Sequence, residues 1–273
     1  MELGNWLAEV RRRRPLVHNM TNLVVTNAVA NALLAIGASP VMAYAHEEVE
    51  DMARISGGLA LNMGTLNPEL ITGMLLAGRA AAQAGVPVVF DPVGVGATPY
   101  RNRSADEIVH QLNLSVLRGN AGEIGQIVGS GGTVSGVDAM DAGQELPGAA
   151  ARFAREHRTV VVATGEEDLV TDGTRSWVLH NGHAWLSRIT GSGCMLTGII
   201  GAFVAVADRQ MGAEGYAEAA VAAVTCLNLA AEKAAALSEG PGTFAAHLYD
   251  ALYTLSPDDV DRGARIERWG AGT

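Results

Sequence analysis

The stretch VPVVFDP (residues 86–92) indicates the fold class, because a fully apolar run ends there abruptly in a carboxylate. Similar runs lie before and after it along the chain: GLALN (58–62), SVLRGN (115–120) and TVVVATG (159–165). Helical segments separate these runs, and uninterrupted apolar strands are typical of a parallel sheet that is covered on both faces. The sequence therefore predicts an α/β fold with helices on both faces of a mostly parallel sheet.

The remaining segments fit the same plan. Asn67 followed by Pro68 predicts the start of a helix that runs to Gly85, since a capping side chain and then proline mark a helix N-terminus. Earlier in the chain, we expect an apolar helix and then a short strand over residues 22–36 and 39–43. A hairpin is then predicted over residues 168–185. Three helices follow it, over residues 193–211, 214–238 and 243–254. With no internal repeat and no linker, one domain over residues 1–273 is predicted.

Polar side chains follow each of the four apolar strands. Asn62 ends the first, Asp91 the second, residues 118–120 the third and Thr164 with Gly165 the fourth. Ligands of open α/β sheets bind outside the carboxyl ends of the strands. These residues should therefore share one crevice, although they lie far apart in sequence.

Composition excludes several classes of protein. The chain has 273 residues, a formal net charge of −10 and 48% hydrophobic residues, which argues for a large core and against a nucleic-acid surface. Lys233 is the only lysine, so the lysine-containing P-loop is ruled out. The two cysteines lie in apolar helical contexts, where a disulfide framework is not expected. Without a signal-peptide pattern or an uninterrupted apolar span, we expect a soluble cytoplasmic protein that does not enter membranes.

The segment ITGSGCMLTG (189–198) places a Gly-rich turn before an apolar helix. Its backbone N–H groups would converge on an anion, and the helix terminus would favour a thiolate at Cys194. The turn lacks the glycine spacing of the dinucleotide fingerprint, which disfavours a Rossmann oxidoreductase. Three roles for Cys194 stay open at this point: a covalent nucleophile, a buried structural thiol, or the residue that faces the attacking hydroxyl of a kinase substrate.

Four polar side chains are candidates for phosphate chemistry. Asp91 and Glu123 could hold Mg²⁺, directly or through water; alternatively, Asp91 caps a turn and Glu123 lies in a solvated helical turn. Arg118 has the planar fork that suits a phosphate, with a surface ion pair as its alternative. Thr164 with Gly165 could donate to a nucleotide phosphate or simply close a strand.

Three further features are interpreted as structural or left without an assigned function. Cys226 is expected to be a small core side chain on an Ala-rich helix. The arginines in RRRRP (11–15) are interpreted as the solvated face of a short amphipathic helix. The Gly/Ser segment GSGGTVSGVDA (129–139) is either a lid or merely a connection.

Taken together, five segments of the chain resemble the hydroxyethylthiazole kinase family of the ribokinase-like superfamily. They are VHNMTNLVVTNAVANALLAIGASPVMA (17–43), DPVGVGAT (91–98), RGNAGE (118–123), ATGEEDLVTDG (163–173) and TGSGC (190–194). The resemblance extends from about residue 15 to GPGTF (240–244), and the five motifs occur in the family's order. It implies a ribokinase-like three-layer sandwich and the phosphorylation of 4-methyl-5-(2-hydroxyethyl)thiazole by ATP with Mg²⁺, in thiamine biosynthesis or salvage.

The resemblance also implies roles for individual residues. Arg118 and Thr164 would contact ATP, and Asp91 and Glu123 would organise magnesium, with Glu123 completing an Asn-x-x-Glu pattern. Cys194 would take the place of the general-base aspartate of most superfamily members. The family's trimer, with sites shared between subunits, is expected as well. The thiazole pocket would be lined by Asn22, Met42, Gly64, Thr65 and Gly191.

Three other functions compete with this one. A pyrimidine kinase of the same pathway would have a larger pocket and a differently built turn. A cysteine hydrolase or transferase would be inactivated by a thiol alkylator that ATP does not block. A nucleotide sensor without catalysis would bind ATP but not turn it over.

Overall fold

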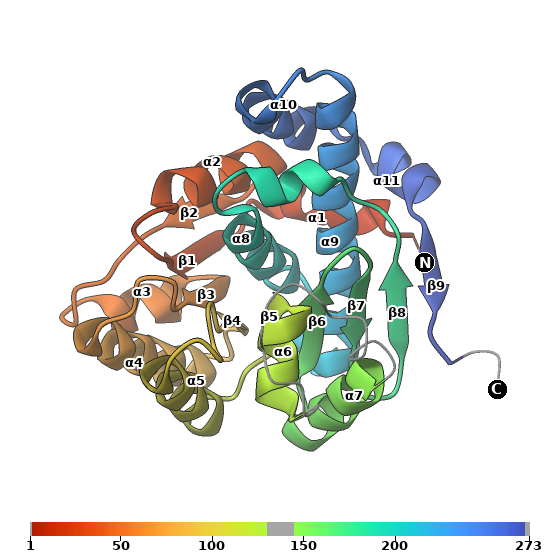
Figure 1. Ribbon diagram of the computed structural model, residues 1–273. Coiled ribbons are helices and arrows are strands. Elements are labelled where there is room, and N and C mark those ends of the chain that lie inside the picture. The colour runs from red at the N-terminus through yellow and green to blue at the C-terminus, as the bar shows by residue number, and fades with distance from the viewer. Residues whose placement is uncertain (1, 130–144, 271–273) are drawn as a thin grey trace.

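The computed structural model describes residues 2–129 and 145–270. Its centre is a nine-stranded sheet in the order β2-β1-β3-β4-β5-β6-β7-β8-β9 (Figure 1). The first six strands run parallel: β1 (Leu16–Met20), β2 (Ser39–Val41), β3 (Gly58–Asn62), β4 (Val88–Asp91), β5 (Val116–Asn120) and β6 (Val160–Thr164). Three antiparallel strands complete the sheet: β7 (Asp168–Thr171), β8 (Ser176–Leu179) and β9 (Ile266–Arg268).

Two hydrophobic clusters, one on each face of the sheet, give the molecule three layers. One cluster joins the strands to α1 (Gly4–Arg13), α2 (Thr26–Ile36), α8 (Ser192–Val204), α9 (Ala213–Ala236), α10 (Pro241–Thr254) and α11 (Pro257–Gly263). The other joins them to α3 (Val49–Ile55), α4 (Pro68–Gln83), α5 (Pro99–Gln111), α6 (Ala121–Val128) and α7 (Glu145–His157). Successive strand residues face opposite layers, as the pleat requires, so Val89 joins the first cluster and Phe90 the second. The predicted α/β sandwich is confirmed.

Helix α9 runs through the first of these layers. Among the described residues it is the one helix that is long and apolar enough, by length and composition only, to cross a membrane, although Glu218 and Glu232 interrupt its apolar run. However, 78% of its apolar window is buried inside the protein, which is the position of a core helix. Cys226 lies on it, fully buried as predicted.

Some details differ from the sequence-based prediction. Helix α2 begins at Thr26 rather than at residue 22, because residues 22–25 form a turn in which Val25 N donates to the carbonyl of Asn22. Helix α8 ends at Val204 instead of continuing to residue 211, and Asp208 caps a separate short 3₁₀ turn there. Strand β1 was not predicted, because the polar His18 and Asn19 interrupt its apolar pattern although both are buried.

The interpretation of the arginine run as a solvated face was wrong for Arg11. Its guanidinium is half-buried and donates to the carbonyl oxygens of Leu252 (2.9 Å) and Leu255 (2.7 Å). The last carbonyls of a helix have no intrahelical partner, so Arg11 supplies donors to the end of α10. The Gly/Ser segment 129–139 lies outside the described residues except for Gly129, which ends α6 in a left-handed conformation.

Candidate active site

The carboxyl ends of β4, β5 and β6 open into a cavity of about 900 Å³. Asp91 ends β4, Arg118 lies in β5 and Thr164 ends β6, and all three line the cavity. The side chains are directly bonded: Arg118 Nη1 lies 3.3 Å from Asp91 Oδ2, and Arg118 Nη2 donates to Thr164 Oγ1 at 2.7 Å. The expected crevice is therefore confirmed for these three strand ends, whereas Asn62 contacts Asp91 but is not among the described residues that line the cavity.

Asp91 is fully buried, and its two oxygens have different environments. Oδ2 accepts hydrogen bonds from Asn62 Nδ2 (2.9 Å) and Thr197 Oγ1 (2.7 Å) in addition to Arg118. Oδ1 is buried and has no hydrogen-bond partner among the described residues. Burying a carboxylate oxygen without a hydrogen-bond donor costs free energy unless a ligand binds to it. Mg²⁺ prefers oxygen ligands, so it is a suitable partner for this atom.

Glu123 lies opposite, in the first turn of α6, and is half-buried rather than solvated. Its Oε1 accepts from the backbone N–H of Gly94 (2.8 Å), and its Oε2 accepts from that of Asn120 (2.9 Å) in a reciprocal capping box. Burial, followed by the charge of Asp91, raises the pKa of Glu123 against the lowering effect of these bonds. The two carboxylates therefore give this part of the cavity a negative potential that favours a bound cation.

This donor set fits magnesium. No cluster of three or more potential metal ligands occurs in the described part of the chain. Mg²⁺ does not need one, because it is usually held by one or two carboxylates, water and substrate phosphates. The free Oδ1 of Asp91 and the Glu123 carboxylate meet that requirement.

Arg118 is the positive charge of the site, but it does not lie on the surface. It is 7% exposed, and its Nε is buried without a hydrogen-bond partner in the part of the chain that the structure describes. A Cβ atom on Gly193 would lie 2.6 Å from Arg118 Nη1, so glycine is required there for the turn to approach the guanidinium. Its pairing with Asp91 is thus a buried ion pair, not the surface pair weighed as an alternative.

The turn at residues 191–194 begins α8, and all four of its residues line the cavity. Gly191 has a φ of 87°, which only glycine adopts without strain, and a Cβ there would lie 2.6 Å from Val25 Cγ1. The first N–H groups of a helix lack intrahelical acceptors. The turn therefore offers backbone donors to an anion in the cavity.

Cys194 is a half-buried thiol held by two amides. Its Sγ accepts from Asn62 Nδ2 (3.2 Å) and Asn22 Nδ2 (3.3 Å). Burial, with the charge of Asp91 second, raises the pKa of Cys194 to about 11, although both amides and Arg118 lower it. The thiol is therefore protonated at neutral pH, and the thiolate expected from the helix terminus does not form.

The covalent-nucleophile alternative needs a base beside the sulfur. In the described part of the chain, no hydrogen bond links a histidine to Cys194, although His183 lines the same cavity. His183 Nδ1 instead accepts from the backbone N–H of Trp185 at 3.2 Å. Without a base and with a raised pKa, this thiol has no means of activation as a nucleophile.

The predicted substrate residues divide into two groups. Asn22, Gly64 and Thr65 lie together beside Cys194: a Cβ on Gly64 would lie 2.7 Å from Asn22 Nδ2, and Thr65 Oγ1 accepts from Leu23 N at 3.0 Å. Gly191 lies at the start of α8, on the cavity wall. Met42 is half-buried against the hydrophobic core. Of the five predicted substrate residues, Gly191 alone is among the described residues that line the cavity, and Asn22, Met42, Gly64 and Thr65 are not.

Sequence reasoning placed Asn62 in the crevice without naming its partners, and it did not single out Thr197 or Arg101. Asn62 and Thr197 both donate to Asp91, and Arg101 ties two loops by donating to the carbonyls of Val93 and Gly64. Thr197 follows Gly193 by four residues, so it faces the same side of α8 as the turn; this spacing was the available signal. No sequence pattern indicates the role of Arg101.

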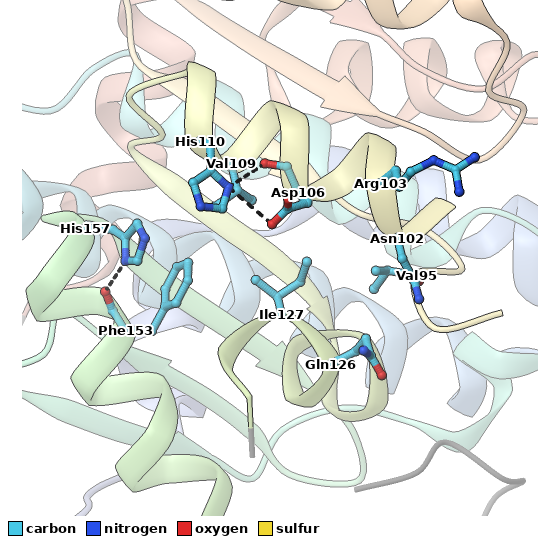
Figure 2. Close-up of a pocket in the computed structure, with 10 residues that line it drawn as sticks. All are labelled: Val95, Asn102, Arg103, Asp106, Val109, His110, Gln126, Ile127, Phe153 and His157. Atoms are coloured by element: carbon cyan, nitrogen blue, oxygen red, sulfur yellow. Dashed lines mark hydrogen bonds and ion pairs between the residues drawn. The ribbon is translucent and has the colours of Figure 1, made fainter. Parts of the chain in front are cut away.

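A second cavity, of about 500 Å³, lies between α5, α6 and α7, separate from all the predicted site residues (Figure 2). The ring of His157 stacks on that of Phe153, with centroids 3.9 Å apart. On α5, His110 Nδ1 lies 2.8 Å from the backbone carbonyl of Asp106. These aromatic and polar groups are satisfied by near neighbours on their own helices.

The three-layer sandwich, with a glycine-rich turn, a buried arginine and two carboxylates around one cavity, has the ribokinase-like fold. A relative from Enterococcus faecalis of the ribokinase-like superfamily has this fold, with a TM-score of 0.57, 12% identity, and coverage of 87% of this chain and 86% of that one.

Closer relatives narrow the class. The hydroxyethylthiazole kinase family model matches residues 7–258, and this chain belongs to that family. It is 50% identical to a hydroxyethylthiazole kinase from Moorella thermoacetica over 270 residues, covering 97% of this chain and 99% of the relative. The structure of a hydroxyethylthiazole kinase protein from Pyrococcus horikoshii has a TM-score of 0.87 and 41% identity, covering 97% of this chain and 98% of that one.

Proposed function

We propose that the chain transfers the γ-phosphoryl group of ATP to the hydroxyl of 4-methyl-5-(2-hydroxyethyl)thiazole, with Mg²⁺, in thiamine biosynthesis or salvage in the cytoplasm. The observation that carries this proposal is the convergence of the anion-binding turn, Arg118 and the two carboxylates on one cavity. Membership of the family supports the choice of the thiazole alcohol over other acceptors.

Phosphoryl transfer depends mainly on positioning and on electrostatic stabilisation. Arg118 and Thr164, which are bonded to each other, would contact the phosphates of ATP. The N–H groups at the start of α8 would stabilise the negative charge on the transferring group. Asp91 and Glu123 would hold Mg²⁺, which neutralises phosphate charge when it is bound.

In this site Cys194 shapes the acceptor side of the cavity. A thiol that is protonated at neutral pH cannot take up a second proton from the substrate hydroxyl. A loose transition state for phosphoryl transfer makes little demand on a general base. We therefore assign Cys194 to contact with the attacking hydroxyl rather than to proton abstraction.

The thiazole would lie beside Cys194, with Asn22, Gly64, Thr65 and Gly191 around it and Met42 as a further wall. We propose a homotrimer in which neighbouring subunits share each site. Leu23 and Val24, directly after Asn22, are 73% and 70% exposed, which favours a protein contact next to the substrate residues. Met42 does not line the cavity of a single chain, which agrees with a pocket that one subunit alone does not complete.

The test is to incubate the purified protein with Mg-ATP and the thiazole alcohol, with hydroxymethyl-pyrimidine in parallel, and to identify the products by mass spectrometry. Thiazole phosphate with stoichiometric ADP supports the proposal. Pyrimidine phosphate alone would move the protein to the rival kinase. Bound ATP without any phosphorylated product would instead favour a nucleotide sensor.

A further inference from the structure

The side chain of Asn62, at the end of β3, connects the two halves of the site. It is 2% exposed, and its Nδ2 donates both to Asp91 Oδ2 (2.9 Å) and to Cys194 Sγ (3.2 Å). Its Oδ1 accepts from the backbone N–H of Gly64 (3.0 Å) and from Asn22 Nδ2 (3.0 Å). The amide therefore uses both of its N–H donors and both of its acceptor positions.

The orientation of this amide follows from one of its partners. The backbone nitrogen of Gly64 can only donate, so the oxygen of Asn62 must face it. The NH₂ group must then face the carboxylate and the sulfur. Strand register explains the reach, because Asn62 pairs with Asp91 across β3 and β4, and their side chains leave adjacent strand ends.

These bonds determine which atoms remain available to ligands. On Asp91, three donors occupy Oδ2 and leave Oδ1 free for the metal side. On Cys194, the two amide donors of Asn22 and Asn62 occupy the sulfur as an acceptor. The S–H group of Cys194, which lines the cavity, is left to point toward the acceptor hydroxyl.

We propose that Asn62 is a positioning residue for phosphoryl transfer, and that its amide sets the separation and direction between the Asp91 carboxylate and the Cys194 thiol. The inference rests on the proposed function, in which these two groups face the metal-bound nucleotide and the acceptor alcohol. In-line transfer requires the attacking hydroxyl and the γ-phosphoryl group to be aligned. A displacement of either group by about 1 Å costs about 100-fold in rate.

Two variants of Asn62 test this role. Asn62→Leu keeps the branched shape of the side chain, although it is larger, and removes all four hydrogen bonds. Asn62→Asp retains oxygens for Gly64 and Asn22 and removes the two donors. Both are expected to lower kcat by about 10- to 100-fold. KM for the thiazole alcohol and for ATP should change by less than about threefold, since Asn62 is not expected to touch either ligand.

A second readout uses the ligand-free, metal-free protein. Alkylation of Cys194 by iodoacetamide at one alkaline pH, followed by peptide mass spectrometry, should be several-fold slower in both variants. The reason is that amide donors stabilise the thiolate that reacts. Cys226 is fully buried and serves as the unreactive internal reference. Because no kinase turnover is involved, this readout stays informative even if the wild-type protein lacks the proposed activity.

The control is Asn19→Ala, which removes another buried amide from the neighbouring strand β1, where Asn19 Nδ2 bonds to the carbonyl of Val17. It should lower the melting temperature without changing kcat or the alkylation rate. Folded Asn62 variants with wild-type kcat would overturn the proposal. So would a loss of kcat with an unchanged alkylation rate, which would reveal a purely structural amide.

A double-mutant cycle separates the two explanations further. The part of the Asn62 effect that acts through Cys194, rather than through Asp91, should make the cost of Cys194→Ala in kcat smaller in the Asn62→Asp background than in the wild type. Strictly additive effects would contradict the coupling.

Discussion

At the scale of single residues, Cys194 gives the sharpest expectation. Cys194→Asp should keep or raise kcat, because a carboxylate in that place can accept the hydrogen bonds of Asn22 and Asn62 and can also act as a base. Cys194→Ala should lower kcat only modestly, since the thiol mainly shapes the site. Steady-state kinetics of both variants, with folding checked by circular dichroism, measure this. An inactive but folded aspartate variant would contradict the assigned role.

Arg118 carries the second residue-scale prediction. Arg118→Lys keeps the charge but loses the planar fork that bonds Asp91 and Thr164 together. We expect kcat/KM for ATP to fall by about 100-fold, the range found for a lost charge-assisted contact in the transition state. Arg12→Lys, on the exposed face of α1, is the matched control and should leave kcat/KM unchanged. Equal kinetics for the two variants would show that Arg118 does not contact ATP.

Sequence reasoning at this scale succeeded where a residue type is restricted by its chemistry. Asp91, Arg118 and Thr164 could be grouped because strand ends of a parallel sheet meet at one edge. It failed on the state of Cys194, whose pKa depends on burial and on a carboxylate that is distant in sequence. It placed Asn62 in the crevice but did not identify its contacts, because a single asparagine after a strand does not indicate which side chains surround it.

Among the helices, α11 begins with a capping box between Ser256 and Asp259, and its contribution to the free energy of unfolding depends on pH. Asp259 Oδ2 accepts from the backbone N–H of Ser256 (2.9 Å) and pairs with Lys233 Nζ (2.9 Å). The backbone bond from Ser256, and then Lys233, hold the pKa of Asp259 well below its usual range. A depressed pKa means that the stabilisation is complete above the unfolded pKa of about 4 and is lost as the pH falls below it.

Asp259→Asn should therefore lower the melting temperature at pH ~7 by about 2–4 °C, which corresponds to about 1 kcal/mol of capping free energy. The difference from the wild type should shrink toward zero at pH values well below ~4. Asp258→Asn, one residue earlier and paired only on the surface with Arg262, is the control and should have little effect. A difference that persists in acid would contradict the role of the charge.

The elements themselves were predictable where apolar periodicity was clean. Strands β3 to β6 and the start of α4 at Asn67 and Pro68 agree with the sequence pattern. Strand β1 was missed because His18 and Asn19 are polar yet buried, their polar atoms bonding to the backbone of Ala43 and Val17. A sequence pattern shows that a side chain is polar, but it does not show whether a backbone carbonyl lies close enough to accept its hydrogen bond.

At the scale of the whole molecule, the proposed trimer links assembly to catalysis. Leu23→Glu would place a charge on the exposed apolar surface that Leu23 and Val24 form beside Asn22. We expect this variant to sediment as a monomer in analytical ultracentrifugation and to lose most of its kinase activity, while keeping its circular dichroism spectrum. Leu237→Glu, on an equally exposed leucine at the end of α9, is the control and should leave both mass and activity unchanged. A monomeric wild type with full activity would contradict the shared site.

The protonated thiol of Cys194 also bears on how the protein withstands oxidants. Peroxide attacks thiolates, and susceptibility to sulfenic acid formation follows thiolate character and exposure. A half-buried thiol with a pKa of about 11 is a poor target on both counts. We therefore expect the proposed activity, with Cys194 in the candidate active site, to survive peroxide exposure that inactivates enzymes with low-pKa cysteines.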